Sequence, residues 1–275
     1  LNHLLANREG RKLAVIVNDF SEVNIDAALV AGEGHLERGE DRFVELSNGC
    51  ICCTLREDLI ESVGKLARSG RFDQIVIEST GISEPMPVAA TFEWEFADGT
   101  TLADVAPIDT MVSLVDASTF LDYLRRGKSL ASENIEATPS DDRTVADLLV
   151  DQVEFADLIL VTKTDLVDAA ETERVIATVR AMNPRARVVM VTDGAIDPRL
   201  VLDAHLYDVA TAATYHGYAE ELAKPHTPET EEYGISSVVF RADRPFNRDR
   251  LLAALRASTG LVRSKGYCWL DTDLQ

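Results

Sequence analysis

Three cysteines lie within four positions in the segment NGCICCTLRED, residues 48–58. They are Cys50, Cys52 and Cys53, and the chain has one further cysteine, Cys268. Thiolates are soft ligands that bind Zn²⁺, Co²⁺, Cu⁺ or iron. A helix that starts after Cys53 would favour their thiolate form. Because a closed structural zinc site uses four ligands, three local thiols predict an exchangeable metal site with an open position.

Redox chemistry and simple packing are alternative explanations of the cysteine cluster. An iron–sulfur cluster generally needs four protein ligands, and a disulfide between adjacent cysteines is unusual, so we favour metal binding. Glu22, in the segment NDFSEVNID, is a candidate oxygen ligand if its loop faces the thiols, and otherwise an exposed loop acid. Cys268 lies in an apolar segment beside Trp269, so we expect it to be a core residue.

A nucleotide-binding pattern ends the apolar run LILVTKTD, residues 158–165. Thr162, Lys163, Thr164 and Asp165 match the guanine-binding pattern usually written Asn-Lys-x-Asp. The Asp carboxylate can accept hydrogen bonds from the ring N–H and the exocyclic amine of guanine, while the Lys stem lies over the base. The alternative is that these polar residues only begin a helix, with Thr164 or Asp165 as its cap.

Two more apolar runs end in a carboxylate. Glu78 closes QIVIE and is followed by Ser-Thr-Gly81. In P-loop NTPases a carboxylate at such a position holds Mg²⁺ or its waters, and a glycine lets a backbone N–H approach the terminal phosphate. Asp116 closes TMVSLVD and is a further candidate for the nucleotide site. Either acid could instead stabilise the turn that follows it.

Short apolar runs alternate with segments of helical periodicity, which predicts a doubly wound α/β domain with a mostly parallel sheet. The predicted strands are 13–17, 43–46, 74–78, 110–116, 158–163 and 187–192. The predicted helices are 54–68, 143–155, 170–182 and 197–206. Because ligands of such sheets bind at the carboxyl ends of the strands, the polar residues that follow the strands are expected along one edge.

The composition changes near residue 211. Residues 211–234 are rich in Pro, Gly and Glu and predict a surface linker after a first domain at 1–210. A strand, a helix and a second strand are expected within 235–275, which would be the start of a smaller α/β domain and too short to complete its sheet.

The net charge of the chain indicates which classes of partner it can bind. The chain has 275 residues with 27 basic and 47 acidic side chains, a net charge of −20, and no cluster of Lys and Arg. We therefore expect neither nucleic acid nor an anionic membrane as a partner. No apolar run is long enough for a membrane-spanning helix. The clustered thiols and the absence of a visible secretory signal favour a cytoplasmic protein.

Several segments together resemble the CobW-like metallochaperone GTPases, which are P-loop proteins of the class that includes nickel-insertion GTPases. The segments are, in order, NDFSEVNIDAALV, LSNGCICCTLRED, IESTGISEP, VDAS, VTKTD, TPETEEYGISSVVFRADRPF and RSKGYCWL. The resemblance implies a Ras-like GTPase domain followed by a smaller C-terminal α/β domain. The phosphate-binding loop of such proteins is not found in residues 1–275, and we expect it, with the strand before it, upstream of Leu1.

For the metal, the resemblance implies that Cys50, Cys52 and Cys53 form a Cys-x-Cys-Cys site with Glu22 beside it. The SEVNID and HTPETEEYGI segments look most like the zinc-responsive branch, so we expect Zn²⁺. The implied function is a GTP-dependent metallochaperone that transfers zinc to a client metalloprotein on GTP hydrolysis. Insertion of Co²⁺ or Fe²⁺, as by activators of nitrile hydratase, is the alternative within the family.

For the nucleotide, the resemblance implies a GTPase with GTP and Mg²⁺ as cofactors. Glu78 and Gly81 match the catalytic element that binds Mg²⁺ and responds to the terminal phosphate. The residues expected to bind the nucleotide are Thr162, Lys163, Asp165 and Asp116, with Thr162 where Asn is usual. A metal-buffering protein without nucleotide binding and a thiol redox sensor remain open from the sequence, and a homo-oligomer is as compatible with it as a monomer.

Overall fold

The computed structural model describes residues 1–6, 10–18, 42–46, 56–79, 83–126, 145–223, 240, 242–257 and 268–273. Five of the residues expected at the functional site lie outside these ranges: Glu22, Cys50, Cys52, Cys53 and Gly81. The others, Glu78, Asp116, Thr162, Lys163 and Asp165, lie inside them.

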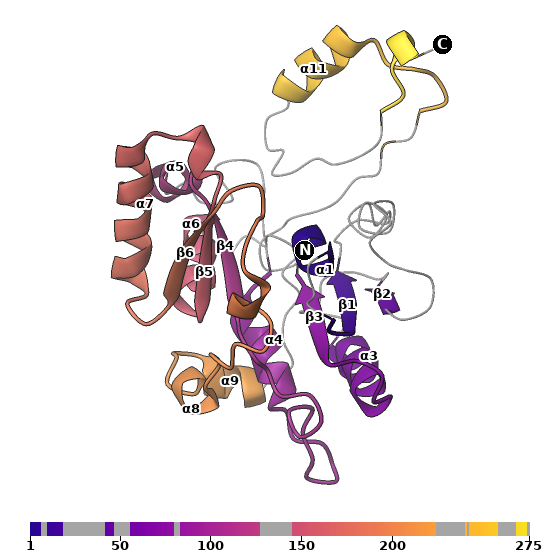
Figure 1. The fold of residues 1–275 in the computed structure, drawn as a ribbon, viewed down its shortest axis with the longest axis vertical. Helices are drawn as coiled ribbons and strands as arrows, with labels where there is room; N and C mark the ends of the chain where they lie inside the picture. Colours follow the sequence, from indigo (N-terminus) through magenta and orange to yellow (C-terminus); the bar gives the residue numbers. More distant parts are fainter. Residues whose placement is uncertain are drawn as a thin grey trace.

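In the described part of the chain, six strands form two parallel sheets of three strands each (Figure 1). The first sheet has the order β2-β1-β3, with β1 at Leu13–Asn18, β2 at Arg42–Leu46 and β3 at Gln74–Glu78. The second has the order β4-β5-β6, with β4 at Val112–Asp116, β5 at Leu158–Thr162 and β6 at Arg187–Val191. Each of these strand pairings is parallel. The predicted parallel α/β class and all six predicted strands are therefore confirmed, with ends that differ by at most two residues.

The described helices lie before the first strand, between the strands and after the last one. They are α1 (Asn2–Ala6), α3 (Arg56–Arg68), α4 (Pro85–Phe92), α5 (Phe120–Arg126), α6 (Val145–Glu154), α7 (Ala169–Met182), α8 (Val209–Ala212), α9 (Tyr218–Ala223) and α11 (Arg248–Ala257). Short 3₁₀ helices are η2 (Thr164–Leu166), η3 (Pro198–Leu200) and η4 (Asp271–Asp273). None of the helices described is both long and apolar enough to span a bilayer.

Three predicted helices correspond to α3, α6 and α7, and the fourth, 197–206, is wrong. Only the 3₁₀ turn η3 forms there, capped by Asp197, whose side chain accepts from the Arg199 N–H. Asp203 and His205 have φ angles of 60° and 51°, in the left-handed region that a right-handed α-helix cannot include. The apolar residues of this segment nevertheless cover a sheet, which explains why their spacing resembled a helix.

Strand β1 is buried on both faces. Its alternate side chains enter two different cores. Ala14 and Ile16 contact a cluster built from α3 and α4, which contains Leu59, Val63, Leu66, Val88 and Phe92. Leu13, Val15 and Val17 contact Leu5 of α1 and Leu202. This two-sided burial accounts for the continuous apolar run of β1.

The second sheet is covered by helices on one face and by an irregular segment on the other. Ile159 and Val161 of β5 pack against α5, α6 and α7. Leu158 and Leu160 face the opposite side, where the residues that cover them are Ile196, Val201 and Leu206. The carboxyl ends of β4 and β5 remain at one edge of this sheet, next to each other in register.

Residues 209–223 contain the short helices α8 and α9, which pack against α4 and Phe155 (Figure 1). Tyr218 is only 2% exposed and lies in a cluster with Ala89 and Ala90 of α4 and with Phe155. The described part of the expected surface linker is therefore a packed segment. Tyr218 is buried, Glu220 is exposed and Glu221 is half-buried, which a reading of composition alone does not reveal.

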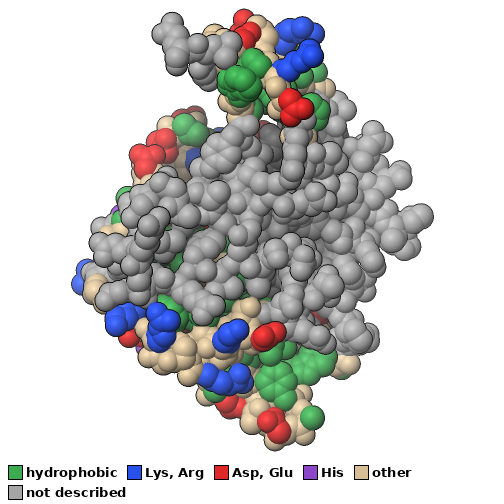
Figure 2. All heavy atoms as spheres, turned by 90° about the vertical axis from the view of Figure 1, so that its right-hand side faces the viewer, with side chains coloured by type: hydrophobic (Ala, Val, Ile, Leu, Met, Phe, Trp, Pro, Cys, Tyr) green, Lys and Arg blue, Asp and Glu red, His purple; other side chains and the backbone are tan. Residues whose placement is uncertain are grey.

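The last described residues contain α11 and an isolated parallel bridge between Phe246 and Leu270. Cys268 is exposed and Trp269 is 52% exposed, so the prediction that Cys268 is a core residue is wrong. The bridge joins backbone atoms, and the side chains of Phe246 and Leu270 are only half-buried. In Figure 2, hydrophobic and charged side chains lie together on the surface of this part of the chain, and Leu252 and Leu255 of α11 are exposed.

Candidate functional site

The carboxyl ends of β4 and β5 bring Asp116, Thr162 and Lys163 together. Asp116 and Thr162 are register partners in the parallel ladder. Thr162 Oγ1 donates to the Val115 carbonyl at 3.2 Å, and the Thr162 carbonyl accepts from the Ala117 N–H at 3.0 Å. The threonine that stands where the guanine pattern usually has asparagine therefore ties β5 to the end of β4.

Lys163 and Asp116 form an ion pair across these two strands. Lys163 Nζ donates to Asp116 Oδ2 at 2.7 Å. Asp116 Oδ1 accepts from Ser118 twice, from its N–H at 2.9 Å and from its Oγ at 2.6 Å. Burial acts to raise the pKa of Asp116, but the hydrogen bonds from Lys163 and Ser118 outweigh it, so this pKa lies below its ordinary value. Asp116 is therefore a fixed anion that holds the Lys163 amine.

The backbone of Lys163 is left-handed, with φ 55° and ψ 31°. This conformation is uncommon for a residue other than glycine and is concentrated at functional sites. It turns the chain from β5 into η2, where Asp165 is exposed, and the Leu166 N–H donates to the Lys163 carbonyl at 3.1 Å. The two residues of the guanine pattern that would contact a base thus lie on one turn at the carboxyl end of a parallel strand.

Glu78 ends β3, which belongs to the other sheet. It is half-buried and is the register partner of Val17 in β1. Its place at the carboxyl end of a strand matches the place expected of a Mg²⁺-binding carboxylate. Gly81 lies outside the described residues, so the roles of both residues in hydrolysis remain predictions.

Ser83, immediately before α4 of the first sheet's core, contacts α6 of the second sheet's core, which we did not predict. Ser83 and Glu84 are buried immediately before α4. The Ser83 carbonyl accepts from Gln152 Nε2 of α6 at 3.0 Å, and α6 packs on the second sheet. The sequence signal was the pair of prolines at 85 and 87, which are typical of a helix start and place Ser83 and Glu84 at its N-terminus.

The expected metal ligands Cys50, Cys52, Cys53 and Glu22 lie outside the described residues, so their coordination remains a prediction. The flanking elements are described. Strand β2 ends at Leu46, in register with Asn18 of the parallel strand β1, and α3 begins at Arg56. The cysteine segment therefore starts from the same edge of the first sheet as the one at which Glu78 ends β3.

Parallel strands with polar side chains at their carboxyl ends are typical of nucleotide-binding α/β proteins. Residues 1–190 match the family model for the CobW/HypB/UreG nucleotide-binding domain. Residues 235–275 match that for the cobalamin synthesis protein cobW C-terminal domain. The chain belongs to the CobW/HypB/UreG family.

Curated relatives agree with this family. The chain is 43% identical over 283 residues to zinc-regulated GTPase metalloprotein activator 1 of Dictyostelium discoideum, a match that covers 98% of this chain and 59% of the relative. It is 30% identical to the zinc chaperone YjiA of Escherichia coli K12, with coverage of 98% of this chain and 77% of the relative. The chain thus spans about three fifths of the first relative and about three quarters of the second.

A solved structure shares the fold. It is the Zn(II)-bound YjiA GTPase from E. coli, with a TM-score of 0.51 and 23% sequence identity. The match covers 93% of this chain and 70% of that one. The similarity supports the arrangement of parallel strands and helices described above.

Proposed function

We propose that this protein is a GTP-dependent zinc chaperone. It binds and hydrolyses GTP, holds Zn²⁺ at Cys50, Cys52 and Cys53 with Glu22 nearby, and transfers the metal to a client metalloprotein. The single observation that carries the nucleotide part is the turn at the end of β5, where Lys163 is paired with Asp116 and Asp165 is exposed. The names of the relatives, a zinc-regulated GTPase metalloprotein activator and a zinc chaperone, support the zinc part.

The chemistry of Asp165 suits guanine. Its two carboxylate oxygens can accept from the ring N1–H and the C2 exocyclic amine of guanine, whereas adenine has an unprotonated N1 and only a hydrogen at C2. Lys163 supplies an aliphatic stem beside the base. Its amine is held by Asp116 at 2.7 Å, so the stem is oriented before any nucleotide arrives.

The phosphate end would involve Glu78 and Gly81. Mg²⁺, when bound, would neutralise phosphate charge, and Glu78 is the described carboxylate that would hold it or its waters. The Gly81 backbone would respond to the presence of the terminal phosphate. The connection from this segment to α6, through Ser83 and Gln152, gives a change at the phosphate a direct route to the second sheet.

Coupling between nucleotide and metal requires that Zn²⁺ binds with different affinity in the different nucleotide states. The cysteine segment follows β2 and the segment of Gly81 follows β3, and both strands end at the same edge of the first sheet. A rearrangement of one segment on hydrolysis would therefore alter the other over a short path. Three thiolates without a fourth protein ligand would release the metal more readily than a closed site.

Zinc competition titrations of the protein with its native N-terminus test this proposal. We expect the Zn²⁺ affinity with Mg²⁺ and a non-hydrolysable GTP analogue to differ at least tenfold from that with GDP, which corresponds to about 1.4 kcal/mol of coupling. The control is Asp165→Asn, which should bind zinc without responding to guanine nucleotides. Equal zinc affinities in all nucleotide states would contradict the proposal and leave a metal-buffering protein. Parallel titrations with Co²⁺ and Fe²⁺ test the alternative metals.

A further inference from the structure

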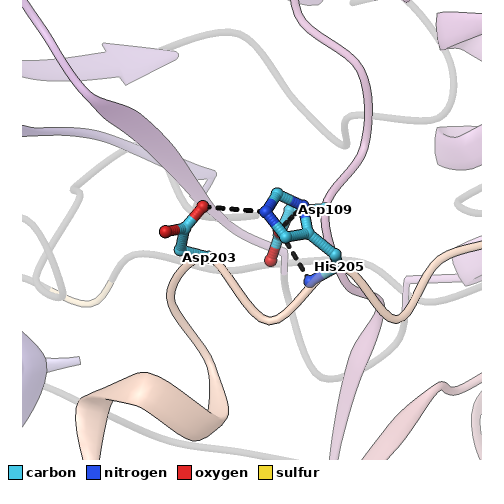
Figure 3. A group of neighbouring side chains, drawn as sticks. All are labelled: Asp109, Asp203 and His205. Carbon is cyan, nitrogen blue, oxygen red and sulfur yellow. Dashed lines mark hydrogen bonds and ion pairs between the residues drawn. The ribbon is translucent and has the colours of Figure 1, made fainter.

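A group of side chains that could hold a metal ion lies at the other end of β4 from Asp116. Figure 3 shows Asp109, from the segment before β4, beside Asp203 and His205, from the loop after η3. One ligand atom from each of the three residues lies within 4.8 Å of the others. Asp109 and His205 are 96 positions apart, so only the fold brings them together.

Asp109 is the fixed member of this group. Its Oδ1 accepts from the His205 N–H at 2.9 Å, and its Oδ2 accepts from the Ala204 N–H at 3.1 Å and from Thr110 Oγ1 at 2.9 Å. Its side chain is 19% exposed, against 78% for His205. The backbone of the loop is therefore anchored on Asp109 independently of the imidazole ring.

The imidazole of His205 lies between two carboxylates. Nδ1 is 3.1 Å from Asp109 Oδ1, and Nε2 is 3.0 Å from Asp203 Oδ1. A neutral imidazole has one N–H, so it can donate to only one of these oxygens, and its other nitrogen then faces carboxylate lone pairs. One of the two nitrogen–oxygen contacts therefore has no hydrogen bond in the neutral ring, and the contact with Asp203, which is 59% exposed against 19% for Asp109, is the one that a metal ion can reach.

We propose that His205 Nε2 and the Asp203 carboxylate bind Zn²⁺, with Asp109 as the positioning residue that accepts from Nδ1–H. Metal-bound histidines almost always donate their other N–H to a carboxylate or carbonyl, which fixes the tautomer. Two ligands at about 2.0 Å from one tetrahedral zinc lie about 3.3 Å apart. The observed separation of 3.0 Å between Nε2 and Oδ1 is close to this value, so a small movement of two exposed side chains admits the ion.

The donor atoms of this site determine which metal ion it prefers and how tightly the ion binds. Imidazole nitrogen suits Zn²⁺, whereas Mg²⁺ and Ca²⁺ prefer oxygen ligands alone. Only two protein ligands contact the ion, and water completes its coordination, so exchange is fast. Arg11 Nη2 lies 3.5 Å from Asp203 Oδ2 and opposes a second cation, which further limits the affinity. This site depends neither on the thiols nor on a nucleotide.

Zinc titration calorimetry of the 275-residue chain with Cys50, Cys52 and Cys53 all changed to Ser tests the proposal. With Zn²⁺ alone, we expect one bound equivalent and a zinc-dependent rise in melting temperature. Asp203→Asn and His205→Asn should each weaken this binding about tenfold or more. Asparagine tolerates the left-handed φ at both positions, so the loop is retained. His216→Asn, at an exposed histidine outside the group, is the matched control and should bind zinc unchanged.

Two results would overturn this assignment: no zinc binding by the thiol-free chain, or equal zinc affinity in His205→Asn. If the triple serine variant does not fold, the same comparison is made with the cysteines present. His205→Asn should then bind one equivalent fewer than the His216→Asn control, and an equal stoichiometry would overturn the site. Because none of these titrations contains a nucleotide, their failure would leave the proposed GTP-dependent function untouched.

Discussion

Lys163 Nζ lies 2.7 Å from Asp116 Oδ2 and so connects the residue after β5 to the last residue of β4. The side chains are 55% and 28% exposed, and ion pairs this open to solvent contribute little to stability. Asp116 is also held by two hydrogen bonds from Ser118. We therefore interpret the role of this ion pair as positioning the Lys163 side chain for a ligand.

Asp116→Asn tests this interpretation. The amide keeps an acceptor for Ser118 and removes the charge that holds Lys163, so we expect GTP affinity to fall by about 3- to 10-fold. The free energy of unfolding should change by less than about 1 kcal/mol. Titration with a fluorescent GTP analogue and urea unfolding measure the two effects. Asp122→Asn, which breaks a 2.9 Å exposed pair with Arg125 in α5, is the control, and an equal loss of affinity there would contradict the role.

Asp165→Asn should change the base that is bound. The amide presents a donor where the carboxylate offered an acceptor to the exocyclic amine of guanine, so we expect a loss in GTP affinity of about 100-fold or more. Xanthine carries a carbonyl in place of that amine, and xanthosine triphosphate should then bind better than GTP. Competition between the two nucleotides measures the change. A variant that still prefers GTP would show that Asp165 does not contact the base.

Cys52→Ser and Cys53→Ser should each weaken zinc binding at least about tenfold, since a hydroxyl is a poor replacement for a thiolate ligand. Competition with a chromophoric chelator measures the affinity. Cys268→Ser is the matched control, because Cys268 is exposed and lies outside the predicted cluster. Unchanged zinc affinity in both cluster variants would place the metal elsewhere.

The pKa of Asp157 predicts that the free energy of unfolding depends measurably on pH. Burial raises its pKa above the ordinary value of 3.8, against the lowering effect of a hydrogen bond from the Met111 N–H. Between 3.8 and the raised pKa, the folded state binds more protons than the unfolded state, so this group makes the free energy of unfolding fall as pH rises through that window.

Asp157→Asn removes this dependence while keeping an acceptor for the Met111 N–H. We expect the variant to gain stability relative to the unmodified protein as pH rises from 3.8 to neutral, as measured by urea unfolding at several pH values. Asp116→Asn should behave in the opposite sense, because the lowered pKa of Asp116 makes its ionised form stabilising and that contribution is lost as pH falls below 3.8. If the stability of both variants, relative to the unmodified protein, changed with pH in the same direction, the raised pKa of Asp157 and the lowered pKa of Asp116 would both be contradicted.

The strands could be predicted from the sequence because each one is a short, nearly continuous apolar run, as buried parallel strands require. The position of Asp116, Thr162 and Lys163 followed from the same rule, since residues after parallel strands share an edge. Helix α4 was missed because PMPVAATF is apolar on all sides and has no amphipathic period. Its burial between two cores explains that composition.

Contacts between segments that are distant in the sequence could not be predicted from the sequence. Asn183 is 3% exposed, and its Nδ2 lies within 2.9 Å of the carbonyls of Val153, Glu154 and Ala156. Nothing in the local sequence distinguishes this asparagine from an ordinary residue at a helix end. The group of Asp109 with His205 depends in the same way on a chain path that was predicted as a helix and is not one.

Helix α4 contributes side chains to two cores. Val88 and Phe92 pack with the first sheet, while Ala89 and Ala90 pack with Phe155 and Tyr218. Neither core can come apart without exposing apolar surface that belongs to the other. We therefore expect the first sheet and the segment of α8 and α9 to unfold in one cooperative transition, for which the calorimetric and van't Hoff enthalpies of melting agree.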